Sequence, residues 1–119
     1  MRSKGNAPTA AQKRWHDAVA SLGSIISGGP AVLHHAVGAT AKHNKIHIGE
    51  WWVIPLTDEE HKALHRGERP WWRGNDQWLD CDSRKEFEKS AFVLVTCFFN
   101  EKAYGVTKEI RDAIQDYHR

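Results

Sequence analysis

The stretch WWVIPLTDEEHKALH, residues 51–65, decides the fold of this chain because it places a strand directly before a capped helix. Residues 51–56 are aromatic and β-branched, which favours a strand, and Pro55 confines that strand to a sheet edge or a strand end. Residues 57–60 form a capping box, Thr-Asp-Glu-Glu. The sequence therefore predicts a helix over about 57–66.

Two pairs of histidines flank this strand and could meet on one metal ion. His61 and His65 are four residues apart in the predicted helix, so their imidazoles share one face. His34 and His35 lie in a second predicted strand over 31–37, after a Gly-Gly-Pro turn. Each pair alone is more often solvated than metal-bound. A hairpin folded back on the helix would instead join three imidazoles with open positions, which is typical of catalytic metals.

The remaining segments surround this strand–loop–strand–helix unit. In chain order they are a flexible basic arm (1–8), a helix (9–22), a loop (38–50), an irregular Trp-rich stretch (67–82), a long helix apolar nearly all round and therefore buried (83–102), and a last helix after Thr107. We expect one α+β domain over 9–119, with a hairpin-plus-helix core at about 24–67, an N-terminal helix and two C-terminal helices in the helical part 83–118.

Composition excludes several classes of protein. The 119 residues suit one domain, with 40% apolar and 27% charged residues, as in globular proteins. The formal net charge is only +2, so any nucleic-acid contact must come from a local patch. Two cysteines, Cys81 and Cys97, suggest neither a disulfide framework nor a cysteine-based zinc site. No apolar run has the length of a membrane span or a signal peptide, so we expect a cytoplasmic protein.

The stretch from Ser24 to His65 resembles the HNH (ββα-metal) endonucleases, and more narrowly the phage recombination-enhancement (Ref-like) nucleases. The residues that carry the resemblance are Ser24-Ile25-Ile26-Ser27-Gly28, Leu33-His34-His35, Ile48-Gly49, Val53-Ile54-Pro55-Leu56 and His61-Lys62-Ala63-Leu64-His65, preceded by the helix of Gln12-Lys13-Arg14-Trp15-His16.

This resemblance implies a two-stranded antiparallel ribbon packed on a helix and clasping one divalent metal ion. His34, His61 and His65 would be the metal ligands, and His35 the general base in phosphodiester hydrolysis. The ion would be zinc, nickel, manganese or magnesium; imidazole ligands favour the later transition metals, whereas magnesium prefers oxygen ligands. The resemblance also implies a protein of a bacterial cell, encoded by the bacterium or by a phage. It further implies DNA as a substrate read with weak sequence specificity, and a recombinase filament as a partner.

The chain departs from the family pattern at the residue that orients the base. Trp52 stands where the family has its middle Asn, and an indole has no carbonyl with which to orient His35. A backbone carbonyl or another loop residue, such as Asn44 or His47, must then replace it.

A second departure concerns a structural zinc that related nucleases hold with two cysteine pairs. Ser24 and Ser27 stand at the first pair, and Thr57 and Glu60 at the second. Hydroxyl groups are poor zinc ligands at neutral pH, so we expect this zinc to be absent. The capping box and the Trp pairs would then stabilise the fold in its place.

Basic side chains near the predicted site are candidates for DNA contact, because basic groups beside aromatic ones suit a phosphate backbone and unstacked bases. The candidates are Lys42, His43, Lys45 and His47 in the loop, and Arg66, Arg69 and Arg73 after the helix.

Two other functions remain open: a DNA- or protein-binding module that kept the fold and lost activity, and a structural zinc protein with a closed site.

Overall fold

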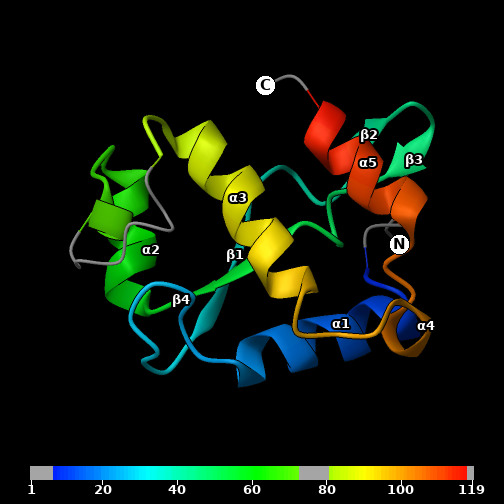
Figure 1. Cartoon of the computed structure of the whole chain (residues 1–119), viewed down its shortest axis with the longest axis horizontal. Helices are drawn as coiled ribbons and strands as arrows, with labels where there is room; N and C mark the ends of the chain where they lie inside the picture. Colours follow the sequence, from blue (N-terminus) through cyan, green and yellow to red (C-terminus); the bar gives the residue numbers. More distant parts are fainter. Residues whose placement is uncertain (1–6, 73–80, 118–119) are drawn as a thin grey trace.

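The computed structural model describes residues 7–72 and 81–117, which form a small α+β domain (Figure 1). Its elements are α1 (Ala10–Ser21), β1 (Val32–His35), β2 (Lys42–His43), β3 (Ile46–His47), β4 (Val53–Leu56), α2 (Asp58–His65), the 3₁₀ helix η1 (Pro70–Trp72), α3 (Arg84–Thr96), α4 (Glu101–Tyr104) and α5 (Lys108–Asp116). The helices of this part of the chain are too short or too polar to cross a membrane.

The centre of the fold is the antiparallel pair β1–β4, which leads directly into α2. In the register His34 lies opposite Ile54 and His35 opposite Val53. All four residues of β4 are buried, as a strand covered by α1 and α3 requires. Pro55 is tolerated because β4 has only one neighbouring strand, as the sequence predicts for an edge.

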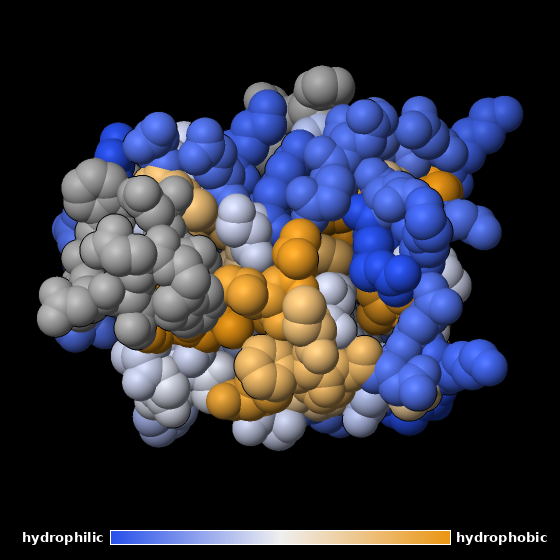
Figure 2. Space-filling view, viewed as in Figure 1, coloured by the Kyte–Doolittle hydropathy of each residue, from blue (hydrophilic) through white to orange (hydrophobic). Residues whose placement is uncertain are grey.

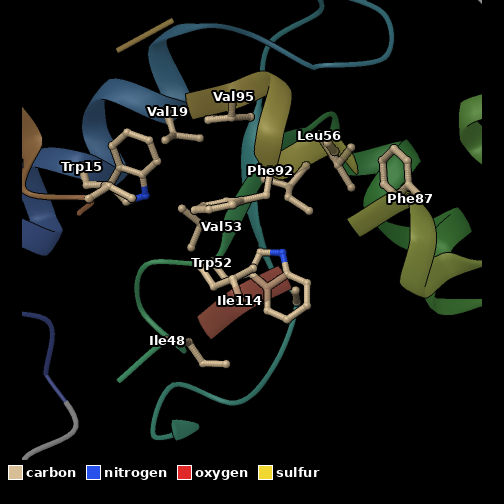
Figure 3. Close-up of a cluster of buried hydrophobic side chains, with 14 of the residues drawn as sticks. Trp15, Val19, Ile48, Trp52, Val53, Leu56, Phe87, Phe92, Val95 and Ile114 are labelled. Carbon is tan, nitrogen blue, oxygen red and sulfur yellow. The ribbon is translucent and has the colours of Figure 1, made fainter. Parts of the chain in front are cut away.

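The core is built from aromatic and aliphatic side chains, many of them on α1, β4 and α3 (Figure 3). Trp15 and Phe92 are almost completely buried and meet edge to face, with ring centroids 6.4 Å apart. Each buried indole also finds an acceptor: Trp15 Nε1 donates to the carbonyl of Trp51, and Trp52 Nε1 donates to that of Glu88. These bonds fix the residues just before β4 between α1 and α3.

The predicted helix caps on α1 and α2 are confirmed. Thr9 accepts from the Gln12 amide, and the Gln12 side chain accepts in return from Thr9. Thr57 and Glu60 form the same reciprocal pair at the start of α2. Both helices therefore begin where the sequence places them, with two amide donors satisfied at each start.

The predicted helix over 83–102 is wrong in its length. Helix α3 ends at Thr96, and α4 begins separately after Asn100, whose side chain accepts from the Lys102 amide. The physical reason is packing: the chain turns so that the Phe99 ring meets Trp15 edge to face at 5.3 Å, which a continuous helix would prevent. Three helices rather than two therefore follow α2 and η1 in the described residues.

Helix α3 is also less buried than its composition predicts. Phe92 and Val95 lie in the core, but Val93 is 48% exposed and Phe98, just beyond the helix, 63% exposed. An apolar patch accordingly crosses the surface over the C-terminal half of α3 (Figure 2). Cys97 is exposed in the same region, whereas Cys81 is buried.

The predicted loop over 38–50 contains a small hairpin, β2–β3. Its two turn residues, Asn44 and Lys45, have φ angles of 53° and 65°. Left-handed backbone at both positions is what a two-residue hairpin turn requires, and Asn adopts it readily. The sequence does not predict this hairpin, because Lys45 stands at the second turn position, where Gly is the usual signal.

Candidate metal centre

Three imidazoles converge where β1 passes α2. His34 lies on β1 and is completely buried, whereas His61 is half-buried and His65 is exposed. The Nδ1 atoms of His34 and His61 are 3.2 Å apart, and one ring nitrogen from each of the three residues lies within 4.8 Å of the others. Nitrogens bound to one tetrahedral zinc are about 3.3 Å apart, so this donor set fits a divalent transition metal.

A buried carboxylate fixes the orientation of His34. Glu88 Oε2 lies 2.7 Å from His34 Nε2, and both side chains are 0% exposed. Arg84 Nε donates to the same oxygen at 3.1 Å. Because the carboxylate accepts the Nε2 proton, the Nδ1 lone pair of His34 points toward His61, as metal ligation requires.

The sequence analysis does not identify Glu88 as part of the site. Its only local signal is that a charged residue falls on the buried face of α3, between Phe87 and Ala91. Buried carboxylates need a partner, so such a position marks a candidate for pairing. Its partner lies 54 residues away along the chain, however, and no local pattern identifies that partner.

The surroundings of His61 disfavour its protonated form. The pKa of His61 is lowered from its ordinary value, chiefly by burial and then by the neighbouring imidazoles of His34 and His65. Asp58 opposes this shift with its negative charge. A neutral imidazole offers a lone pair, so the lowered pKa favours a metal ligand over a cation at this position.

His35, the predicted base, lies in a different group of side chains. Its Nε2 is 3.0 Å from Glu50 Oε1, and its ring meets that of His16 edge to face at 5.6 Å. The loop does supply a partner for His35, as expected, but that partner is Glu50 rather than Asn44 or His47. Glu50 lies next to Trp51, and nothing in the local pattern distinguishes it from an ordinary surface carboxylate.

Trp52, at the position of the family's Asn, is completely buried and donates to the Glu88 carbonyl. Its indole N–H is therefore already bonded to Glu88 and does not orient the imidazole of His35. Its bond instead connects β4 to the turn of α3 that carries Glu88. Trp52 thus supports the carboxylate behind His34.

The residues at the expected zinc-cysteine positions form a hydrogen-bonded group. Ser24 Oγ donates to Glu60 Oε1 at 2.5 Å and accepts from the amide of Ser27. The same Glu60 oxygen accepts from the Thr57 amide. Ser24 and Thr57 thus both donate to the buried carboxylate of Glu60, which can hold the turn before β1 against the start of α2.

The structure separates the predicted DNA-contacting residues into two groups. Lys42, His43, Lys45 and His47 are on the β2–β3 hairpin beside α5, whereas Arg66 and Arg69 follow α2 at the opposite end of the molecule (Figure 1). They do not form one continuous patch. Arg73 lies outside the described residues.

Some of these basic groups already have acidic partners. His43 Nε2 lies 2.8 Å from Asp116 Oδ2, and Arg66 is paired with Glu68 at 2.7 Å. Lys42 and His47 share a surface hollow with Glu50, and Arg69 shares another with His65 and Arg84. Basic residues thus share one hollow with His65 and the other with Glu50, the partner of His35.

Comparison of the chain with family models, with curated proteins and with solved structures finds no match. The resemblance to HNH nucleases therefore depends on the residues of this chain alone.

Proposed function

We propose that the protein is a metal-dependent DNA endonuclease of the HNH (ββα-metal) class that hydrolyses phosphodiester bonds with low sequence specificity, in phage recombination or DNA processing. The observation that carries this proposal is the convergence of His34, His61 and His65 on the β1–β4–α2 unit, with His65 exposed to substrate. A recombinase filament as partner and a bacterial cytoplasmic location belong to the same proposal.

Each residue of the site has a distinct task in this reaction. His34, held through Nε2 by Glu88, presents Nδ1 alongside the nitrogens of His61 and His65. A divalent metal held there supplies Lewis acidity at a phosphodiester oxygen. His35 takes the proton of the attacking water at Nδ1, because Glu50 accepts the proton on Nε2.

Basic side chains that can contact the substrate line the two hollows next to these groups, together with Glu68 and Asp82 in one hollow and Glu50 in the other. Arg69 and Arg84 line the hollow that contains His65, and Lys42 lines the one that contains Glu50. Guanidinium and ammonium groups bind phosphate oxygens independently of base sequence. This arrangement supports weak sequence specificity.

A catalytically degenerate DNA- or protein-binding module is the second candidate, and one observation favours it. His34 and His35 are adjacent on a strand, so their side chains leave opposite faces, one buried and the other exposed against α1. In addition, Trp52 has replaced the family's orienting Asn. A module of this kind would bind metal at the three histidines without cleaving DNA.

Plasmid nicking distinguishes the two candidates. Purified protein is incubated with supercoiled DNA in EDTA, magnesium, manganese, nickel or zinc, next to His35→Ala and His61→Ala. His118→Ala is the matched control, because that histidine has no assigned role. Metal-dependent nicking that both variants lose and the control keeps supports the nuclease. Metal binding without nicking under any condition supports the module.

A further inference from the structure

A second group of metal-ligating side chains lies on the opposite face of β1 from the first. It consists of His16 on α1, His35 at the end of β1, and Glu50 in the turn before β4. Each residue offers one nitrogen or oxygen atom, and these three atoms lie within 4.8 Å of one another. The group shares no residue with the three-histidine centre.

The distances in this group are compatible with one shared metal ion. Glu50 Oε1 is 3.0 Å from His35 Nε2 and 3.6 Å from His16 Nε2. These values lie on either side of the spacing of about 3.3 Å between ligands of a tetrahedral zinc. One carboxylate oxygen thus faces two imidazole nitrogens, and both must be unprotonated to bind the same ion.

Burial and chain connectivity also hold the group together. The side chains of His16 and Glu50 are only 14% and 12% exposed, whereas that of His35 is 39% exposed and leaves a path for an ion. The backbone carbonyl of Glu50 is 2.7 Å from His16 Nε2 and binds its proton when no metal is present. Ligation through Nε2 therefore requires that proton to move to Nδ1, with loss of the hydrogen bond to the carbonyl.

We propose that His16, His35 and Glu50 form a second metal site that takes a transition-metal dication such as Zn²⁺ or Ni²⁺. Two imidazoles and one carboxylate are a donor set that zinc and nickel accept, whereas calcium and magnesium prefer oxygen ligands. Three protein ligands leave a position open to water. The site is distinct from the three-histidine centre in every ligand.

One consequence rests on the proposed nuclease function. A metal ion bound to His35 Nε2 leaves the imidazole proton on Nδ1, and the proposed nuclease needs the Nδ1 lone pair for its base. Zinc in excess then inhibits the cleavage that the first zinc ion permits. The activity would then depend on the concentration of free metal. Zinc at the three-histidine centre would permit cleavage, and zinc at the second site, on the other face of β1, would prevent it.

Metal counting tests the site without reference to activity. The protein is dialysed against zinc, and bound zinc is measured for wild type, His16→Gln, Glu50→Gln and His65→Gln. Gln at position 16 can still donate to the Glu50 carbonyl but is a poor zinc ligand. His43→Gln is the matched control, because His43 faces the Asp116 carboxylate at 2.8 Å but belongs to no group of three possible metal ligands in the described residues.

We expect His16→Gln and Glu50→Gln each to bind one zinc ion fewer than wild type, and His43→Gln to bind the same number. The double variant His16→Gln/His65→Gln should bind no zinc ion tightly. Equal zinc binding by wild type and His16→Gln, with circular dichroism showing both folded, would overturn the second site.

The nicking assay then separates this inference from the proposed function. In wild type, activity at excess zinc should fall at least about tenfold below its maximum, because loss of a general base costs at least that much. In His16→Gln, activity at excess zinc should stay close to the maximum. A zinc difference without any nicking supports the second site and contradicts the nuclease. Nicking with the same fall at excess zinc in both proteins contradicts the inhibitory role.

Discussion

Replacing Glu88 by Gln should weaken metal binding at the three histidines while leaving the fold intact. Glu88 Oε2 accepts from His34 Nε2 at 2.7 Å and from Arg84 Nε at 3.1 Å, and its side chain is 0% exposed. The amide has nearly the same shape, so it can keep the bond to His34, but it removes the negative charge behind the imidazole. Water cannot replace that charge in a buried site.

The expected loss follows from the role of carboxylates behind ligating histidines. Removing such a partner weakens metal affinity by about 10–100-fold, or about 1.4–2.7 kcal/mol. We expect Glu88→Gln to fall within this range, because its carboxylate is the charge-assisted acceptor on the most buried ligand, His34.

Competition with a chromophoric zinc chelator measures this loss. The titration is made in the His16→Gln background, so that the three-histidine centre dominates the signal. Glu86→Gln is the matched control, because Glu86 is an exposed carboxylate on the same helix that contacts the Asp82 amide instead. An affinity of Glu88→Gln within about twofold of the control, with both proteins folded, would refute the role of Glu88.

Three further predictions concern stability. Ser24→Ala should lower the free energy of unfolding by about 1–3 kcal/mol, because buried Glu60 loses a donor at 2.5 Å; urea denaturation next to the exposed Ser27→Ala control measures this. The metal-free protein should lose stability as pH falls below about 6.5, because the lowered pKa of His61 in the folded state means that the unfolded chain binds the proton more readily. Urea midpoints measured across this pH range should therefore fall less steeply in His61→Ala than in wild type. Lys89→Met should lower the melting temperature and cost about 1–2 kcal/mol, because its ammonium donates to two carbonyls at the end of α5, at 2.6 and 2.7 Å; a thermal melt unchanged from wild type would contradict it.

Local rules predict those parts of the fold that local interactions fix. The capping boxes at Thr9 and Thr57 satisfy their own amides within four residues, so they specify where α1 and α2 begin. The pairing of His61 with His65 follows from helix geometry alone. His34 joins them because β1 pairs with β4, as expected for two strands that precede one helix.

Long-range packing decides what the sequence does not reveal. Helix α3 ends early because Phe99 packs on Trp15, which is 84 residues before it in the chain. Glu88 and Glu50 become partners of the two adjacent histidines only after α3 and the turn before β4 have docked. A carboxylate far from its histidine in sequence leaves no periodic signal, so these two residues are beyond local pattern analysis.

The two adjacent histidines can have different chemistry only because the strand register is fixed. His34 faces inward to Glu88 and His35 outward to Glu50, so each imidazole has its own carboxylate. A slip of one residue between β1 and β4 would exchange the two faces. The slip would also place His35 at the buried position beside Glu88 that His34 occupies in the observed register. The register of β1 on β4 therefore determines which histidine serves the three-histidine centre and which remains accessible to solvent.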